Sequence, residues 1–262
     1  MRFGILGPIE VSSGETVLTP SAAKQRVLLA VLLVAGNSVV SVDALIEELW
    51  GDDPPRTALQ AVRVYVSQLR QMLAGLAGPD GSGPALLTRP PGYVLDLGDG
   101  LLDTSEFERL CEQGRRASQD GHLETAADLY RNALSLWRGP ALYDVAAGSR
   151  LAGAAVHLQE QWITAVKRRI DVDLQLNRHM DIVAELRSLI SAHPYHEGLH
   201  ARLMIALYRS GRSGEALSVY RSLRRNLTDE LGIEPNHRLQ QVHQAVLTAD
   251  YRLLEQDDLW TL

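Results

Sequence analysis

Residues 54–73 read PPRTALQAVRVYVSQLRQML, and this stretch decides how the rest of the chain is interpreted. It contains Arg56, Arg63 and Arg70 at a constant spacing of seven, and it contains no acidic residue. The chain as a whole carries a formal net charge of −6. Positive charge that gathers on one segment of a negatively charged protein needs a local explanation.

The stretch has the pattern of a two-sided helix. At roughly 100° per residue, its three arginines fall in one stripe with Gln60 and Ser67. The opposite side is apolar throughout: Ala58, Ala61, Val62, Tyr65, Val66, Leu69, Met72 and Leu73. The basic stripe is either a solvated surface or a surface for an anionic partner. A solvated surface normally mixes charges of both signs, because opposite charges four residues apart stabilise a helix, so the pattern favours the partner.

The flanking segments predict a small α+β domain. In chain order the predicted elements are strands within 2–18, helices over 20–39, 41–50 and 54–77, a loop at 78–84 and two strands over 85–97. Gly51-Asp52-Asp53 forms a tight turn before the basic helix, and Pro90-Pro91-Gly92 turns the final hairpin.

A helix, a turn, a basic helix and then a hairpin form the arrangement that sets a helix in the major groove of DNA. Arginine contacts phosphates or pairs with guanine, and glutamine pairs with adenine. We therefore expect the stripe to contact double-stranded DNA, with Thr88 and Arg89 near the tip of the hairpin as wing residues.

From Thr104 onward every strong segment has helical periodicity, so a domain boundary is predicted near residues 98–104. The segments GHLETAADLYR (121–131) and GRSGEALSVYR (211–221) share Gly, Ala, Tyr and Arg at equal spacing, and NRHMDIVAELR (177–187) is a weaker third copy. This periodicity predicts tetratricopeptide-like helix pairs, although two unrelated amphipathic helices would also satisfy it. The predicted architecture is thus an α+β domain over 1–98 followed by an all-α domain over 104–262.

Several stretches resemble one family closely. Residues 24–70 and LLTRPPGYVLDL (86–97) resemble the OmpR-like winged-helix domain of the Streptomyces antibiotic regulatory proteins. WRG-x-AL (137–142), LYRSGR (207–212) and DELGIEP (229–235) resemble the bacterial transcriptional activation domain of the same family, so the resemblance covers nearly the whole chain.

The resemblance implies a transcriptional activator of a secondary-metabolite gene cluster. It implies binding to direct repeats near a promoter, as side-by-side protomers, and recruitment of RNA polymerase holoenzyme. Asp52 and Asp53 are then either plain turn residues or part of a loop that faces the polymerase. By position it implies DNA contacts from the basic helix and its edge, made by Arg56, Thr57, Gln60, Arg63, Ser67 and Arg70. It implies further contacts from the wing, made by Thr88, Arg89 and Tyr93. Lys24 and Arg26, at the start of the first helix, would touch phosphate. The chain contains no G-x-x-x-x-G-K-[ST] motif, so no nucleotide cofactor is expected.

One motif points to a different class. HEGLH (196–200) satisfies H-E-x-x-H, in which two histidines hold zinc and the glutamate acts as general base. Gly198 weakens a helix at this point, and no following segment offers a clear third ligand. We therefore expect neither a metal site nor an enzyme here.

Composition limits the remaining alternatives. A single cysteine excludes an internal disulfide and fits a reducing cytoplasm, and the abundance of arginine over lysine suggests an actinobacterial, GC-rich genome. No signal peptide is apparent, and the longest apolar run, residues 27–35, is shorter than the ~20 residues of a membrane span. A helical-repeat adaptor that binds protein and not DNA remains the alternative function.

Overall fold

The computed structural model of the chain describes residues 1–14, 16–75, 83–146 and 148–250. Its contacts divide the chain into two compact units. The first comprises Met1–Glu112 and Arg131–Ala165, and the second comprises Gln113–Tyr130 and Val166–Leu262. The predicted loop at 78–84 lies mostly outside the described residues.

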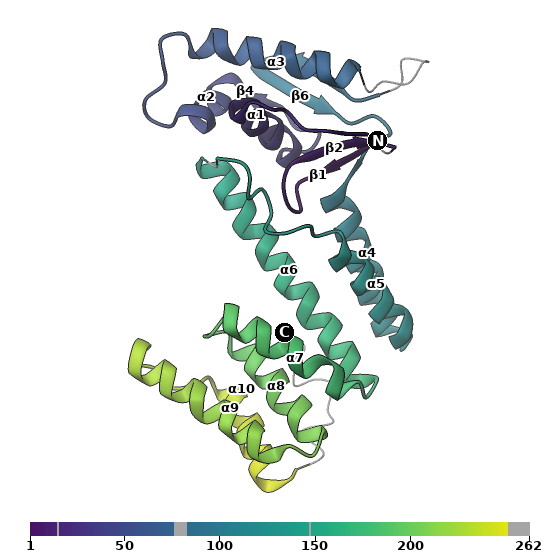
Figure 1. Cartoon of the computed structure of the whole chain (residues 1–262), viewed down its shortest axis with the longest axis vertical. Helices are drawn as coiled ribbons and strands as arrows, with labels where there is room; N and C mark the ends of the chain where they lie inside the picture. Colours follow the sequence, from purple (N-terminus) through teal and green to yellow (C-terminus); the bar gives the residue numbers. More distant parts are fainter. Residues whose placement is uncertain (15, 76–82, 147, 251–262) are drawn as a thin grey trace. The chain divides into compact units, whose positions relative to one another are not determined.

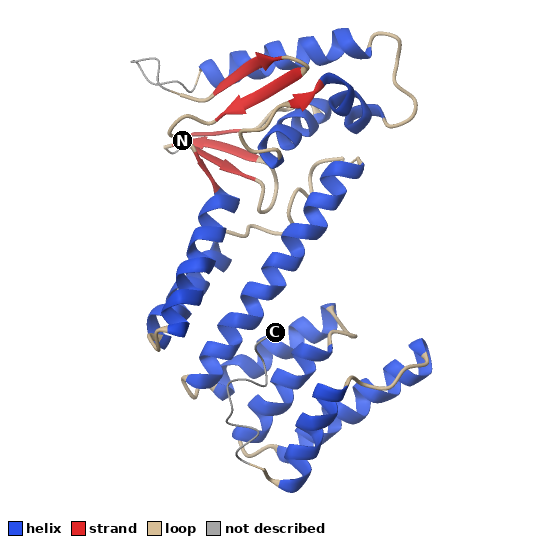
Figure 2. Cartoon of the chain, turned by 180° about the vertical axis from the view of Figure 1, so that it is seen from behind, coloured by secondary structure: helices blue, strands red, loops and turns tan. Residues whose placement is uncertain are grey.

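The first unit contains two small sheets, drawn in red in Figure 2. The four-stranded sheet has the order β3-β2-β1-β7, formed by Thr16–Leu18, Glu10–Ser13, Arg2–Gly4 and Leu101–Leu102. The three-stranded sheet has the order β4-β6-β5, formed by Val40–Ser41, Gly92–Asp96 and Ala85–Arg89. The predicted strands at 2–18 and 85–97 are confirmed, and the two-residue strands β4 and β7 were not predicted.

Three helices, α1 (Ala23–Val34), α2 (Val42–Trp50) and α3 (Ala58–Ala74), accompany these sheets (Figure 1). Ser41 caps α2 as expected, since its hydroxyl accepts a hydrogen bond from the Ala44 N–H at 3.2 Å. The prediction that α3 begins at Pro54 is wrong by four residues. A residue that precedes proline disfavours the helical conformation, so the consecutive prolines Pro54 and Pro55 delay the helix.

The core of this α+β part lies on α1. Residues 27–33 of α1 are all buried, and the helix contacts α2, α3 and β6. Phe3, Ile5 and Leu6 from the start of the chain are also buried. Near-continuous burial along α1 explains why its sequence is apolar on every side rather than two-sided.

Three helices contribute residues to both compact units: α4 (Asp103–Gln119), α5 (Leu123–Ser135) and α6 (Ser149–Gln175). In the first unit, Phe107 and Trp137 meet edge to face with ring centroids 5.6 Å apart, and Trp137 and Trp162 do so at 6.4 Å. These tryptophans therefore pack among aromatic side chains.

In the described part of the second unit, all regular secondary structure is helical. Beyond its portions of α4, α5 and α6 it contains α7 (His179–Ala192), α8 (Glu197–Arg209), α9 (Ser213–Asn226), a π-helical turn at Leu227–Leu231 and α10 (His237–Thr248). Among the helices that the structure describes, none combines the length and the apolarity needed to cross a bilayer.

The predicted internal repeat is confirmed at its turns. Gly121 and Gly211 have positive φ angles of 77° and 74°, and Asn177, at the same position of the third copy, has a φ of 60°. In each copy the next residue donates its N–H to a carbonyl five residues earlier, which is the bond of a Schellman cap. Asparagine tolerates this left-handed conformation better than most residues, so the third copy keeps the turn without glycine.

Candidate nucleic-acid interface

Helix α3 has one buried and one exposed side. Its buried residues recur every three or four positions and face α1, α2 and β5: Ala58, Val62, Val66, Leu69 and Leu73. The predicted polar stripe of Gln60, Arg63, Ser67 and Arg70 is exposed along its whole length. Arg56 and Thr57 lie in the turn before the helix, where Thr57 occupies the N-cap position.

The three arginines of the stripe differ in their contacts. Arg70 is committed to the wing: its Nε donates to the Leu86 carbonyl at 2.7 Å, and one Nη donates to the Thr88 hydroxyl at 2.8 Å. The guanidinium also lies 6.0 Å from the centroid of the Tyr93 ring. Arg56 and Arg63 make no comparable contact with any residue in the described part of the chain.

The wing is the β5–β6 hairpin, in which Thr88 is paired with Tyr93 and Arg89 with Gly92. Thr88 and Arg89 are exposed near its tip, whereas Tyr93 is only 8% exposed. Arg89, like Arg56 and Arg63, has no hydrogen bond or ion pair with another described residue. The charge available to a ligand on this side of the unit therefore comes from Arg56, Arg63 and Arg89.

Lys24 and Arg26 make contacts inside the first unit. The Lys24 ammonium donates to the Leu49 carbonyl in the last turn of α2, and it lies 5.3 Å from the centroid of the Trp50 ring. Arg26 donates to the carbonyls of Pro20 and Ser21 at 3.1 and 2.9 Å, and its Nε is 3.8 Å from Asp144. Both side chains are therefore engaged within the first unit, and their predicted contacts with phosphate stay a prediction.

The acidic pair Asp52 and Asp53 lies exposed in the turn between α2 and α3. Gly51 opens this turn with a φ of 63°, a conformation that glycine adopts without strain. Neither carboxylate forms a hydrogen bond or ion pair within the part of the chain that the structure describes. The turn thus presents two negative charges to solvent beside the start of α3.

Sequence analysis missed two apolar residues on α3. Leu59 and Val64 are 45% and 43% exposed, although both are large and hydrophobic. On the helical wheel they fall on either flank of Arg63, so their positions were available from the sequence.

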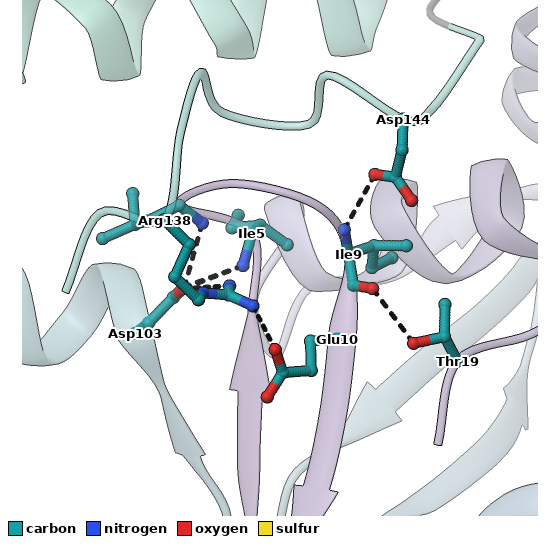
Figure 3. Close-up of polar contacts among 8 residues, drawn as sticks. Ile5, Ile9, Glu10, Thr19, Asp103, Arg138 and Asp144 are labelled. Carbon is teal, nitrogen blue, oxygen red and sulfur yellow. Dashed lines mark hydrogen bonds and ion pairs between the residues drawn. The ribbon is translucent and has the colours of Figure 1, made fainter. Parts of the chain in front are cut away.

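A polar network joins the N-terminal strands to later parts of the first unit (Figure 3). The Asp103 carboxylate, at the start of α4, accepts hydrogen bonds from the Ile5 and Leu6 N–H groups at 3.0 and 2.9 Å. Arg138 bridges Asp103 and Glu10 at 3.1 and 2.5 Å. Burial raises the pKa of the Asp103 carboxyl, and the two N–H groups and Arg138 oppose that rise.

Two further contacts join early and late segments of the first unit. Asp144 accepts a hydrogen bond from the Ile9 N–H at 2.9 Å (Figure 3). Glu48 of α2 is 6% exposed and accepts from the Arg150 and Leu151 N–H groups, both at 3.0 Å. A side chain of α2 therefore caps the N-terminus of α6, where the helix dipole favours a negative charge. This contact could not be predicted from local sequence patterns, because its partners are about a hundred residues apart.

The H-E-x-x-H segment does not lie on one helix. Helix α8 begins at Glu197, so His196 precedes it. The Glu197 carboxylate accepts from the Asn236 N–H at 2.6 Å, and one ring nitrogen of His200 donates to the Pro194 carbonyl at 2.9 Å. The described residues contain no group of three metal-ligating side chains.

Comparison with known families matches both parts of the chain. Residues 16–95 match the family described as "Transcriptional regulatory protein, C terminal", and residues 102–247 match "Bacterial transcriptional activator domain". Together the two matches cover most of the chain.

Individual relatives agree with these matches. The chain is 42% identical over 253 residues to regulatory protein DnrI of Streptomyces peucetius, which covers 95% of this chain and 93% of the relative. It is 41% identical to regulatory protein AfsR of Streptomyces coelicolor over 97% of this chain, but it spans only 25% of that larger protein. The structure of Mycobacterium tuberculosis EmbR in complex with a low-affinity phosphopeptide is similar with a TM-score of 0.89 and 33% identity, over 97% of this chain and 68% of that one.

Proposed function

Because the chain belongs to the Streptomyces antibiotic regulatory protein family of transcriptional activators, we propose that it binds promoter DNA sequence-specifically and recruits RNA polymerase. In this proposal α3 enters the major groove, and the wing contacts the neighbouring backbone. The genes it activates form a secondary-metabolite cluster. Since its target is promoter DNA, the protein acts in the cytoplasm.

One observation carries the proposal: three guanidinium groups without a described partner on α3, its preceding turn and the wing, in a chain of net charge −6. An exposed guanidinium group without a protein partner is available to an anionic ligand, and phosphate and guanine are the DNA groups that match its donor geometry. We assign Arg63, Gln60 and Ser67 to base edges. Arg56, Thr57 and Arg89 are assigned to the backbone.

Arg70, Thr88 and Tyr93 take a different role in this proposal. Arg70 holds the hairpin against α3 through its bonds to Leu86 and Thr88, above the ring of Tyr93. It therefore sets the angle between the groove helix and the wing. Lys24 and Arg26 support the same surface from inside and are left out of the DNA contacts.

The exposed pair Asp52 and Asp53 is proposed as the polymerase-facing element. The pair lies in the turn immediately before the groove helix, and negative charge there would be repelled by the DNA backbone unless it points away from it. A basic surface on the polymerase holoenzyme is its natural complement. A second protomer on the adjacent direct repeat completes the proposed assembly.

A salt series tests the proposal. Binding of the full chain to a duplex from upstream of its neighbouring genes should weaken steeply with salt. The two arginines assigned to the backbone, Arg56 and Arg89, predict a slope of log K against log salt of about −1.8. The absence of salt-dependent binding to any duplex would contradict the proposal and favour the helical-repeat adaptor.

A further inference from the structure

Two exposed apolar side chains distinguish α3 from the other helices of the α+β part. Across the described residues of α1, α2 and α3, only Leu59 and Val64 are large hydrophobic side chains with high exposure, at 45% and 43%. Isolated apolar residues are common on protein surfaces. These two, however, lie on a helix face that contains no acidic residue and whose other exposed members are mainly hydrogen-bonding side chains.

We propose that Leu59 and Val64 are specificity-determining residues that contact the 5-methyl groups of thymines in the operator. This inference rests on the proposed function, because it requires α3 to lie in the major groove. It adds two residues to the proposed base-contacting surface of α3, and it adds thymine to the bases that this surface recognises.

The positions of the two residues bring them beside the polar readers. Leu59 precedes Arg63 by four residues and Val64 follows Gln60 by four, so each pair consists of neighbours on the helix surface. The Cβ atoms of such neighbours lie about 5–6 Å apart, which spans one to two base steps at about 3.4 Å per step. Leu59 also lies in the first turn of α3, the end of a recognition helix that commonly contacts bases.

One group on the base edges of the major groove is chemically suited to contact these apolar side chains. The thymine methyl is the apolar group among the base edges of the major groove, whereas guanine and adenine present the acceptors and donors that suit arginine and glutamine. A face with Arg63 and Gln60 between Leu59 and Val64 therefore complements guanine or adenine with thymine one or two steps away. Removing one methyl from such a contact should weaken binding about four-fold, the equivalent of about 0.8 kcal/mol.

The proposed contacts are tested first by removing thymine methyl groups from the DNA and then by substituting the two residues. An operator is first selected from a random duplex pool with the full chain, and each thymidine is then replaced singly by deoxyuridine, which lacks only the methyl group. Wild-type protein should bind about four-fold more weakly at one or two of these positions. Val64→Ala should lose the penalty at one position and keep it at another, with Leu59→Ala showing the reverse. Val17→Ala serves as control, because Val17 is 58% exposed on β3, which belongs to the four-stranded sheet and not to α3 or the wing.

The outcomes separate this inference from the proposed function. If the wild-type protein binds its operator with a steep salt dependence but every deoxyuridine duplex binds like the parent, the thymine contacts do not exist and DNA binding stands. If the penalties persist unchanged in both alanine variants, other residues contact the thymine methyl groups, and the assignment to Leu59 and Val64 is wrong. If no duplex shows salt-dependent binding, the proposed function itself fails, and this inference fails with it.

Discussion

Arg63 is the central one of the three arginines and lies on the exposed face of α3, and its guanidinium has no partner in the described part of the chain. If it pairs with guanine, Arg63→Ala should cost about 1–3 kcal/mol on the operator and much less on a duplex altered at that guanine. Arg89→Ala is the comparison: a lost phosphate contact should weaken all duplexes alike and reduce the salt slope by about one unit. Fluorescence anisotropy with matched and altered duplexes measures both. Equal losses on both duplexes for Arg63→Ala would exclude base reading by this residue.

Arg70 has the same spacing in the sequence but a different role in the structure. Its guanidinium is held by the Leu86 carbonyl and the Thr88 hydroxyl, so Arg70→Ala should free the wing rather than remove a phosphate contact. We expect weaker operator binding with an unchanged salt slope, together with faster hydrogen exchange in β5. A slope reduced by about one unit, as expected for Arg89→Ala, would show that Arg70 reaches the backbone after all.

At the scale of elements, the helix pairs of the second unit depend on their left-handed turns. Gly211 has a φ of 74°, so Gly211→Ala should lower the free energy of unfolding by about 1 kcal/mol or more. Gly214→Ala is a matched control only three residues away, in the first turn of α9, where a Cβ would meet no neighbour within 4 Å. That change should be neutral or slightly stabilising, because alanine favours a helix over glycine. Urea denaturation distinguishes the two, and equal effects would mean that the turn conformation contributes nothing.

The secondary structure was largely predictable because it depends on local signals. Periodicity located all three helices of the α+β part, and glycine spacing located the repeat turns, including the one where Asn177 replaces glycine. The start of α3 was misplaced because two prolines in succession were treated as helix-opening residues. Strands β4 and β7 were missed because two residues carry no periodicity, and only pairing with β6 and β1 defines them.

At the scale of the whole molecule, sequence reasoning identified the candidate surface but not how charge is distributed within it. The helical wheel placed Arg63 and Arg70 on one stripe. Only the three-dimensional structure shows that the Arg70 guanidinium is bound to the wing, whereas that of Arg63 has no partner among the described residues. Lys24 was expected to touch phosphate, and the sequence did not indicate its contacts with the end of α2 and the ring of Trp50. Such contacts join segments tens of residues apart, and a single sequence contains no record of them.

The last prediction concerns where the winged-helix part of the chain ends. Several hydrogen bonds cross the predicted boundary near 98–104. Asp103 accepts from the N–H groups of Ile5 and Leu6, and Glu48 accepts from the N–H groups at the start of α6. Each buried polar group that loses its partner costs about 1–3 kcal/mol, a large share of the ~5–15 kcal/mol by which domains are stable.

A fragment of residues 1–98 should therefore unfold at a much lower urea concentration than a fragment of residues 1–165, which keeps every one of these contacts. In the full chain, Glu48→Ala should be destabilising and Glu47→Ala, at an exposed neighbouring position, nearly neutral. If the two fragments unfolded at the same urea concentration, the winged-helix part would be an independent domain that ends near residue 98. The contacts of Glu48 and Asp103 would then contribute nothing to its stability.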